Sequence, residues 1–309
     1  SSYFSSNGPL LDPIEEGDIT DDEITPQTEV NASQLNLADS ESLLAYAEDR
    51  GFKQSYLNVH YRSKHPFLIE FSNHAFYGRR LIPIPAKQNY NPIEFIEVNG
   101  LYEAQTNEKE ALKVVDILKN NIKPLSDGSY PSVGVATFNI DQRNLIIGKI
   151  NAERNANPAF DALMTQLGDS FFAKNLENIQ GDERDIIILS TTFGRKANGT
   201  FTQNFGPIIQ SSGHRMLNVI ITRARHKIFI CTSFPQKYTS QYSQLLQQMG
   251  NRGRAILYAY LMYAKSTSEC NEELRKGILD TVSQGCSEKH YESFGSSIGS
   301  ESPFEDEVY

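Results

Sequence analysis

Short apolar segments alternate with amphipathic ones between residues 93 and 233, and this alternation constrains the fold more than any other feature of the chain. DIIILS at 185–190 is apolar at consecutive positions, as in a strand that is covered on both faces. Residues 108–121 instead place apolar side chains at helical spacing. Strands that alternate with helices form a parallel sheet through right-handed crossovers. The sequence therefore predicts an α/β, doubly wound fold with helices on both faces.

The individual elements are predicted from the same pattern. Strands are expected at 93–98, 133–138, 171–175, 185–190 and 227–233. Helices are expected at 39–49, 108–121, about 141–155, Met216 to Ala224, and in several pieces between 236 and 284. Ligands of such folds bind beyond the carboxyl ends of the strands. The functional edge is thus expected just after Phe138, Asn175, Ser190 and Ser233.

Composition changes at both ends and sets the expected domain boundaries. Residues 1–38 are acidic, rich in Pro, Ser, Thr and Gly, and lack periodicity, so we expect an acidic linker or loop there. The α/β domain is expected at 39–235 and a small helical extension at 236–284. Residues 285–309 are rich in Ser and Gly and are expected to form a second linker.

Several classes of protein are disfavoured by what the sequence lacks. No stretch of about 18 apolar residues occurs, which disfavours a membrane span. No signal peptide is visible at the start of the sequence. The three cysteines are too few and too scattered for a disulfide framework or a zinc site. We therefore expect no metal site in this chain and a cytoplasmic, reducing compartment.

Charge is distributed unevenly, although the net charge is −9. Residues 1–50 hold twelve carboxylates against one cation, Arg50. No Asp or Glu occurs from Ile186 to Ser268, where ten basic residues fall: Arg195, Lys196, Arg215, Arg223, Arg225, Lys227, Lys237, Arg252, Arg254 and Lys265. A polyanionic partner would suit this basic stretch, and ordinary surface charge is the alternative.

Two stretches place an aromatic or hydroxyl side chain where it could meet nucleic acid or nucleotide. In HYRSKHP (60–66), Tyr61 could stack on a base and Arg62 could hold a phosphate. The alternative is a surface turn before an amphipathic helix. In VATFNIDQ, Thr137 and Phe138 end a strand and could contact a sugar–phosphate backbone. A simple strand-to-helix junction explains those residues equally well.

Two further stretches carry polar or charged groups next to predicted core elements. In NIQGDERDIIILS, Gln180 and Gly181 form a polar turn, and Glu183 could accept a hydrogen bond from a ribose hydroxyl. A charged turn before a buried strand is the alternative. In MLNVIITRARHK, Arg223 is expected at the end of a helix. An anchored guanidinium can neutralise charge on a transferring γ-phosphate, and a basic cluster at a helix C-terminus is the alternative.

In this order and spacing, the four stretches resemble motifs of the second RecA-like motor domain of superfamily 1 helicases, in the branch of the nonsense-mediated-decay helicases. HYRSKHP resembles motif IV, VATFNIDQ the motif after it, NIQGDERDIIILS motif V, and MLNVIITRARHK motif VI. The resemblance covers roughly residues 40–235. KNLENIQGDERD and NFGPI are similar to large bacterial helicases that carry a C-terminal very-short-patch-repair-type endonuclease. The terminal SPFEDEVY resembles the start of that nuclease.

The resemblance implies a RecA-like fold and a part in an ATP-dependent helicase or translocase that acts on single-stranded nucleic acid, with DNA favoured over RNA. It implies these roles: Tyr61 stacks on adenine, Arg62 reaches the γ-phosphate, Gln180 and Gly181 form a loop near the nucleotide, Glu183 binds the ribose, Arg223 is the arginine finger, and Thr137 and Phe138 touch the single strand. The cofactors would be ATP and Mg²⁺.

The sequence departs from the resembled family in two respects. Arg215–Met216 stands where the family often has paired arginines. No G-x-x-x-x-G-K-[ST] loop and no Mg²⁺-binding acid after an apolar strand occur. In the family these lie on the first RecA-like domain, so we expect a C-terminal piece of a larger protein that cannot hydrolyse ATP alone. The alternative is a non-catalytic module for nucleic-acid binding or assembly.

Overall fold

The computed structural model describes residues 51, 59–86, 90–179, 181–210 and 213–286. All its described helices and strands belong to the unit Leu57–Tyr309. The predicted acidic linker, the predicted helix at 39–49 and the stretch 287–309 lie outside the described residues. The domain boundaries proposed from composition remain predictions.

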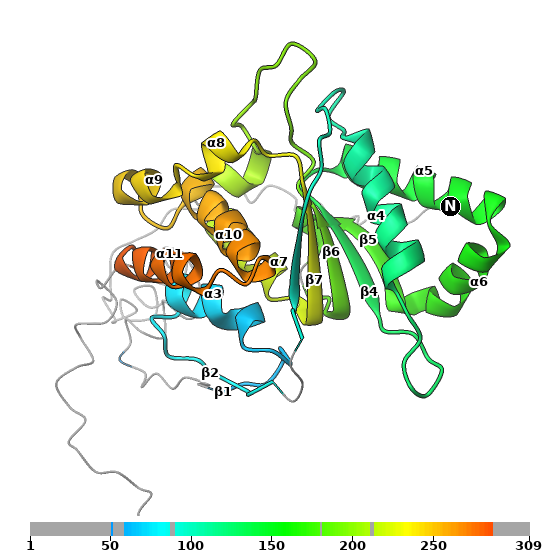
Figure 1. Ribbon diagram of the computed structural model, residues 1–309, viewed down its shortest axis with the longest axis horizontal. Helices are drawn as coiled ribbons and strands as arrows, with labels where there is room; N and C mark the ends of the chain where they lie inside the picture. Colours follow the sequence, from blue (N-terminus) through cyan, green and yellow to red (C-terminus); the bar gives the residue numbers. More distant parts are fainter. Residues whose placement is uncertain (1–50, 52–58, 87–89, 180, 211–212, 287–309) are drawn as a thin grey trace, which may run out of the picture. The chain divides into compact units, whose positions relative to one another are not determined.

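A five-stranded sheet in the order β3-β7-β6-β4-β5 forms the centre of this unit (Figure 1). The strands are β3 (Ile93–Glu97), β4 (Val133–Thr137), β5 (Phe171–Asn175), β6 (Arg184–Ser190) and β7 (Ala224–Thr232). Every pair of neighbouring strands is parallel. Residues Ile187 to Leu189 of the middle strand, β6, are fully buried. The predicted parallel sheet and its strand covered on both faces are confirmed.

Helices cover both faces of the sheet, as predicted. One face carries α4 (Glu108–Asn121), α5 (Ile140–Ala156) and α6 (Pro158–Leu167). Asn107, Asn139 and Asn157 cap these three helices by accepting a hydrogen bond from a backbone N–H in the first turn. The other face carries α3 (Phe67–Phe76), α7 (Gly213–Ile221), α8 (Gln236–Thr239), α9 (Tyr242–Met249), α10 (Gly253–Ser268) and α11 (Glu272–Gln284).

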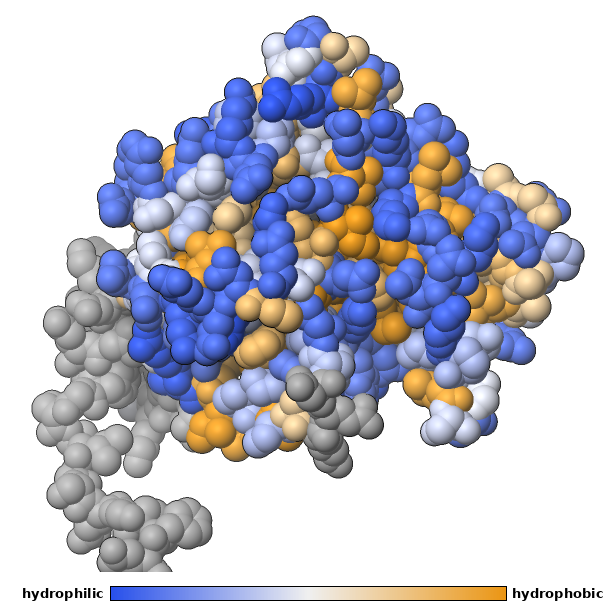
Figure 2. Space-filling view, in the orientation of Figure 1, coloured by the Kyte–Doolittle hydropathy of each residue, from blue (hydrophilic) through white to orange (hydrophobic). Residues whose placement is uncertain are grey.

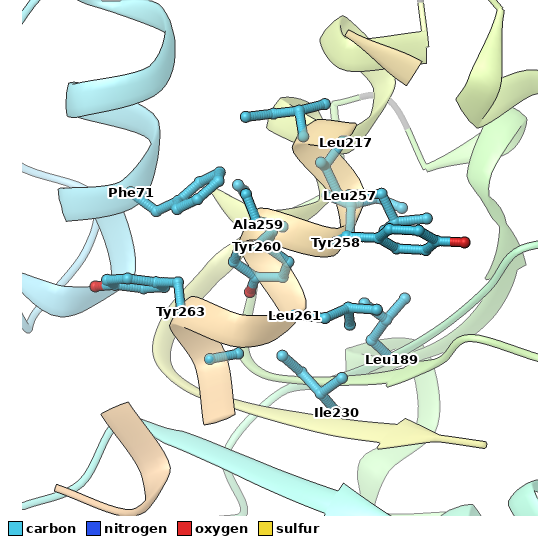
Figure 3. Close-up of a cluster of buried hydrophobic side chains, with 14 of the residues drawn as sticks. Phe71, Leu189, Leu217, Ile230, Leu257, Tyr258, Ala259, Tyr260, Leu261 and Tyr263 are labelled. Atoms are coloured by element: carbon cyan, nitrogen blue, oxygen red, sulfur yellow. The ribbon is translucent and has the colours of Figure 1, made fainter. Parts of the chain in front are cut away.

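Helix α10 is buried almost all the way around. Thirteen of its sixteen residues are buried, which is typical of a helix at the centre of a core. Leu261 lies against Leu189 and Ile230 of the sheet, whereas Tyr260 packs against Phe71 of α3 at 5.3 Å between ring centroids (Figure 3). The predicted helical extension therefore shares one hydrophobic core with the sheet. No helix in the described part of the chain is long and apolar enough to cross a membrane.

The connection from β5 to β6 is unusually short. Only residues 176–183 separate the two parallel strands, and the described residues of this segment include a 3₁₀ turn, Leu176–Asn178. Parallel strands usually need a dozen or more connecting residues. This short crossover delivers Glu183 directly to the amino end of β6.

The chain around Arg223 differs from the predicted helix. Helix α7 ends at Ile221 and β7 begins at Ala224, so Arg223 lies in the turn between them. Ala224 pairs with Arg184 of β6, and this non-local pairing takes the chain out of the helix earlier than the helical pattern indicates. A two-stranded parallel sheet of β1 (Val59–His60) and β2 (Ile82–Pro83) was not predicted either.

Candidate functional site

Three segments of the chain meet at the amino ends of β6 and β7. The backbone N–H of Arg184 donates to the carbonyl of Arg223 at 3.2 Å. The N–H of Lys64 donates to the carbonyl of Arg225 at 2.7 Å. These two bonds fasten the turn that follows β1 and the turn that precedes β7 to the same edge of the sheet.

Arg62, Glu183 and Arg223 are brought together at this edge. Arg62 Nε forms an ion pair with Glu183 Oε1, and the side chains of this pair are 33% and 35% exposed. Burial lowers the pKa of Arg223, and the positive charge of Arg62 lowers it further, whereas Glu183 and Asp182 raise it. The three predicted nucleotide-binding groups thus act on one another electrostatically.

Arg223 is the arginine of this cluster that makes no ion pair among the described residues. Its Nε is buried and has no hydrogen-bond partner within that part of the chain. Glu183 is paired with Arg62, and Asp182 is paired with Lys174 at 2.5 Å. A partly buried charge is unfavourable unless it is paired. The cluster is therefore suited to an anionic ligand, and guanidinium groups match phosphate oxygens well.

The other residues predicted around the nucleotide are less constrained by the structure. Tyr61, directly after β1, is 71% exposed. Gly181 has a φ of +92°, a conformation that favours glycine, and it is exposed. Gln180 lies outside the described residues. Their roles remain predictions.

The functional edge was expected at the carboxyl ends of the strands, and this is wrong as the position of Arg62, Glu183 and Arg223. Glu183 and Arg223 directly precede β6 and β7, so they lie at the amino edge. The reason is their position in the chain: a residue that directly precedes a parallel strand lies at the amino end of that strand. The strands expected at 185–190 and 227–233 already had this order relative to Glu183 and Arg223.

Thr137 and Phe138 do lie at the carboxyl edge, at the end of β4. Both side chains are buried, with Thr137 Oγ1 donating to the carbonyl of Asn139 at 2.7 Å. Phe138 packs against Phe193 and Phe234. In this arrangement only backbone groups or neighbouring residues can reach a nucleic acid, and the predicted contact remains a prediction.

A buried polar network that the sequence did not suggest lies at the same carboxyl edge. Glu110 Oε2 accepts from Ser190 Oγ at 2.7 Å and from the Thr192 N–H at 2.8 Å. Asn107 Nδ2 donates to Glu110 Oε1 at 3.3 Å and to Ser233 Oγ at 2.9 Å. Burial raises the pKa of Glu110 to about 7, against the opposing effect of these hydrogen bonds.

Gln142, in the first turn of α5, extends the network to the helix that follows β4. Its Oε1 accepts from the Asn107 N–H at 2.7 Å, and its Nε2 donates to the Asn107 carbonyl at 3.0 Å and to Ser190 Oγ at 3.2 Å. The sequence signal that could have revealed this site is N-x-x-E at 107–110, the spacing of a capping box. The network joins the carboxyl ends of β3, β4, β6 and β7.

Two loops extend beyond the carboxyl edge of the sheet (Figure 1). Residues of both loops line an open pocket. The pocket has a volume of about 700 Å³. It is lined by Tyr102, Glu103, Ala104, Gln105, Lys196, Ala197, Asn198, Thr202 and Asn204. Hydrophilic residues dominate the tip formed by these loops (Figure 2). No group of three or more His, Cys, Asp or Glu side chains suited to a metal ion occurs among the described residues.

The family is decided by a comparison with protein-family models, in which the model described as AAA domain matches residues 40–234. The chain belongs to the AAA domain family. This AAA domain is also similar to the uncharacterized ATP-dependent helicase MG140 of Mycoplasma genitalium, at 32% identity over 238 residues, which cover 74% of this chain and 20% of that protein. The MG140 homolog of Mycoplasma pneumoniae is 33% identical over 233 residues, with coverages of 74% and 20%.

This chain thus spans about a fifth of the length of these two relatives. Among solved structures, it is similar to one described as the C-terminal domain of a possible DNA helicase from Lactobacillus plantarum. The identity is 15%, the match covers 56% of this chain and 86% of the other, and the TM-score is 0.27.

Proposed function

We propose that this AAA domain is the second motor domain of an ATP-dependent DNA helicase or translocase and supplies Arg223 as an arginine finger. The observation that carries the proposal is the Arg223 guanidinium, which is partly buried beside the Arg62–Glu183 pair and makes no ion pair with any residue that the structure describes. The similarity to proteins named ATP-dependent helicases supports it. A preceding motor domain of the same parent chain would hold most of the ATP and the Mg²⁺.

The residues of the amino edge fit the triphosphate end of ATP. Bound ATP supplies a γ-phosphoryl group whose negative charge increases as the bond to the leaving group breaks, and Mg²⁺ neutralises part of that charge. Arg223 would stabilise the rest, because a guanidinium keeps its proton. Arg62 would add a second contact to phosphate, and the Glu183 carboxylate would accept a hydrogen bond from the ribose.

The carboxyl edge is proposed to contact a single strand of DNA. The support is the position of Thr137 and Phe138 at that edge, together with Arg195 and Lys196 on the loop above it and the lack of Asp and Glu between residues 186 and 268. Contacts would be mainly to the sugar–phosphate backbone. Affinity should therefore fall as salt rises and depend little on base sequence.

The test is single-strand-stimulated ATP hydrolysis by the full-length parent protein with Arg223→Ala. We expect turnover to fall about 10³-fold or more while ATP still binds, because the finger acts on charge in the transition state. Arg225→Ala is the matched control, since Arg225 lies two residues away and pairs with Asp185 at 3.6 Å. Its turnover should stay close to that of the natural protein.

An Arg223→Ala variant with unchanged turnover would contradict the proposal. Together with salt-dependent binding of single strands, that result would favour the alternative, a non-catalytic module for nucleic-acid binding or assembly.

A further inference from the structure

His60 lies in the turn that presents Arg62, and the proposed function assigns it no role. The His60 Nε2 lies 3.0 Å from Ser63 Oγ, and the backbone N–H of Ser63 donates to the same nitrogen at 3.3 Å. Ser63 is almost fully buried, at 2% exposure. The imidazole therefore spans the turn from its first residue to its fourth.

The hydrogen bonding of His60 fixes its protonation state. A backbone N–H can only donate, so Nε2 must carry a lone pair, and the ring proton is on Nδ1. A charged imidazole would have a proton on both nitrogens and could not accept from Ser63. Burial lowers the pKa of His60, and Arg62 lowers it further, while Glu183 raises it. His60 is consequently neutral at pH 7 and close enough to sense the charges of both groups.

The turn is held at its other end as well. The N–H of Lys64 donates to the carbonyl of Arg225 in β7 at 2.7 Å. On the incoming side, His60 pairs with Pro83 in the two-stranded sheet of β1 and β2. The backbone of the turn is thus held on both sides of Arg62. The Arg62 side chain extends from this turn to Glu183.

We infer that His60 is a positioning residue for Arg62, because its Nε2 holds residues 60–63 in the conformation that directs the guanidinium toward Glu183 and Arg223. The inference rests on the proposed function. Removal of the Nε2 acceptor leaves the buried N–H of Ser63 without a partner. The turn then relaxes and Arg62 loses its direction, whereas Arg223, which is carried by a different segment, keeps its place.

The experiment compares three variants in the full-length parent protein. His60→Ala removes the acceptor, and His60→Gln retains one, because the amide oxygen of glutamine can accept from Ser63. His74→Ala is the matched control: His74 is also half-buried and hydrogen-bonded to a serine, with its Nδ1 3.0 Å from Ser283 Oγ, but it lies on α3 and contacts α11.

We expect kcat for ATP hydrolysis to fall about 10- to 100-fold in His60→Ala, the scale of a group displaced by about 1 Å, with a smaller change in KM. His60→Gln should recover most of this loss, and His74→Ala should retain kcat. Unchanged kcat in His60→Ala would overturn the inference. So would an equal loss in His60→Gln and His60→Ala at equal thermal stability.

A pH profile provides a second readout that does not depend on the folding of His60→Ala. In the natural protein, kcat should decline as the pH falls below the pKa of His60, which is itself below 6.5. That decline should be absent from His60→Gln, and superimposable profiles would overturn the inference. Arg223→Ala is measured in parallel: if it is fully active, the proposed function fails, whereas if it is inactive and His60→Ala is active, only the role of His60 fails.

Discussion

The two edges of the sheet differ in how far their polar side chains are buried and hydrogen-bonded. At the amino edge, Arg62 and Glu183 are about one-third exposed, and Arg223 has a buried nitrogen without a hydrogen-bond partner among the described residues. At the carboxyl edge, Glu110 is fully buried, and both of its oxygens accept hydrogen bonds. The first arrangement keeps its charged groups partly exposed, and the second holds loops together through buried hydrogen bonds. The deepest polar cluster of the described residues is thus a structural network, whereas the partly exposed one has groups that an anion could contact.

This difference implies that substitutions at the two edges should have different effects. Changes at the carboxyl edge should lower the free energy of unfolding, whereas changes at the amino edge should lower activity and leave stability nearly intact.

The largest expected effect on stability is that of Glu110→Ala. The substitution removes the acceptor of the Thr192 N–H and of Ser190 Oγ, both buried, so the free energy of unfolding should fall by about 3 to 5 kcal/mol. Urea unfolding measures this. Glu108→Ala is the control on the same helix, because Glu108 is exposed and pairs with Lys149, and it should lose less than about 1 kcal/mol. Equal losses in the two variants would contradict the structural role of the network.

The pH dependence of the same residue should be the next largest effect. The pKa of Glu110 is raised from 4.5 to about 7 in the folded state. The folded state therefore holds the proton of Glu110 more tightly than the unfolded state does. The resulting contribution to the free energy of unfolding is fully present below pH 4.5 and is lost as the pH rises through about 7. This contribution is at most on the order of 3 kcal/mol.

Comparison with Glu110→Gln isolates this contribution, since the amide does not titrate. We expect the stability advantage of the natural protein over Glu110→Gln to shrink between pH 5 and pH 8, where urea unfolding is measured, as the carboxyl ionises. A difference that stays constant across this interval would show that the pKa of Glu110 is not raised.

The smallest expected effect is that of Glu183→Ala on stability. The pair with Arg62 is partly exposed, so its loss should change the free energy of unfolding by less than about 1 kcal/mol. Turnover of the full-length protein should fall nevertheless, because the ribose contact would be lost. Thermal unfolding and hydrolysis rates from the same preparation test both halves of this statement. A loss of stability similar to that of Glu110→Ala would remove the distinction between the edges.

The fold could be predicted wherever the signal was local. Ile187 to Leu189 identify a strand covered on both faces from composition alone, and α4 begins and ends where its apolar spacing indicates. The end of α7 was missed because it depends on the pairing of Ala224 with Arg184, forty residues away in the sequence. A local pattern of apolar residues cannot predict a pairing between residues so far apart in the sequence.

The candidate site was predictable by residue but not by arrangement. Arg62, Glu183 and Arg223 were each singled out by a motif, and the structure brings them together. Glu183 and Arg223 lie at the amino edge because each directly precedes a parallel strand, β6 or β7. The strand pattern does not reveal that the turn after β1 is held beside them, by the bond from the Lys64 N–H to the Arg225 carbonyl. Glu110 was missed because a helical pattern is judged by its apolar positions, and a buried carboxylate interrupts none of them.

The burial of α10 bears on how this domain can be exchanged between proteins. The match to the family ends at residue 234, yet Leu261 of α10 covers Leu189 and Ile230 of the sheet. A chain cut after Phe234 would expose that apolar face to water, and exposed surfaces of this kind promote aggregation. The unit that recombination can move intact must therefore include α10, so the heritable module is longer than the sequence motifs that identify it.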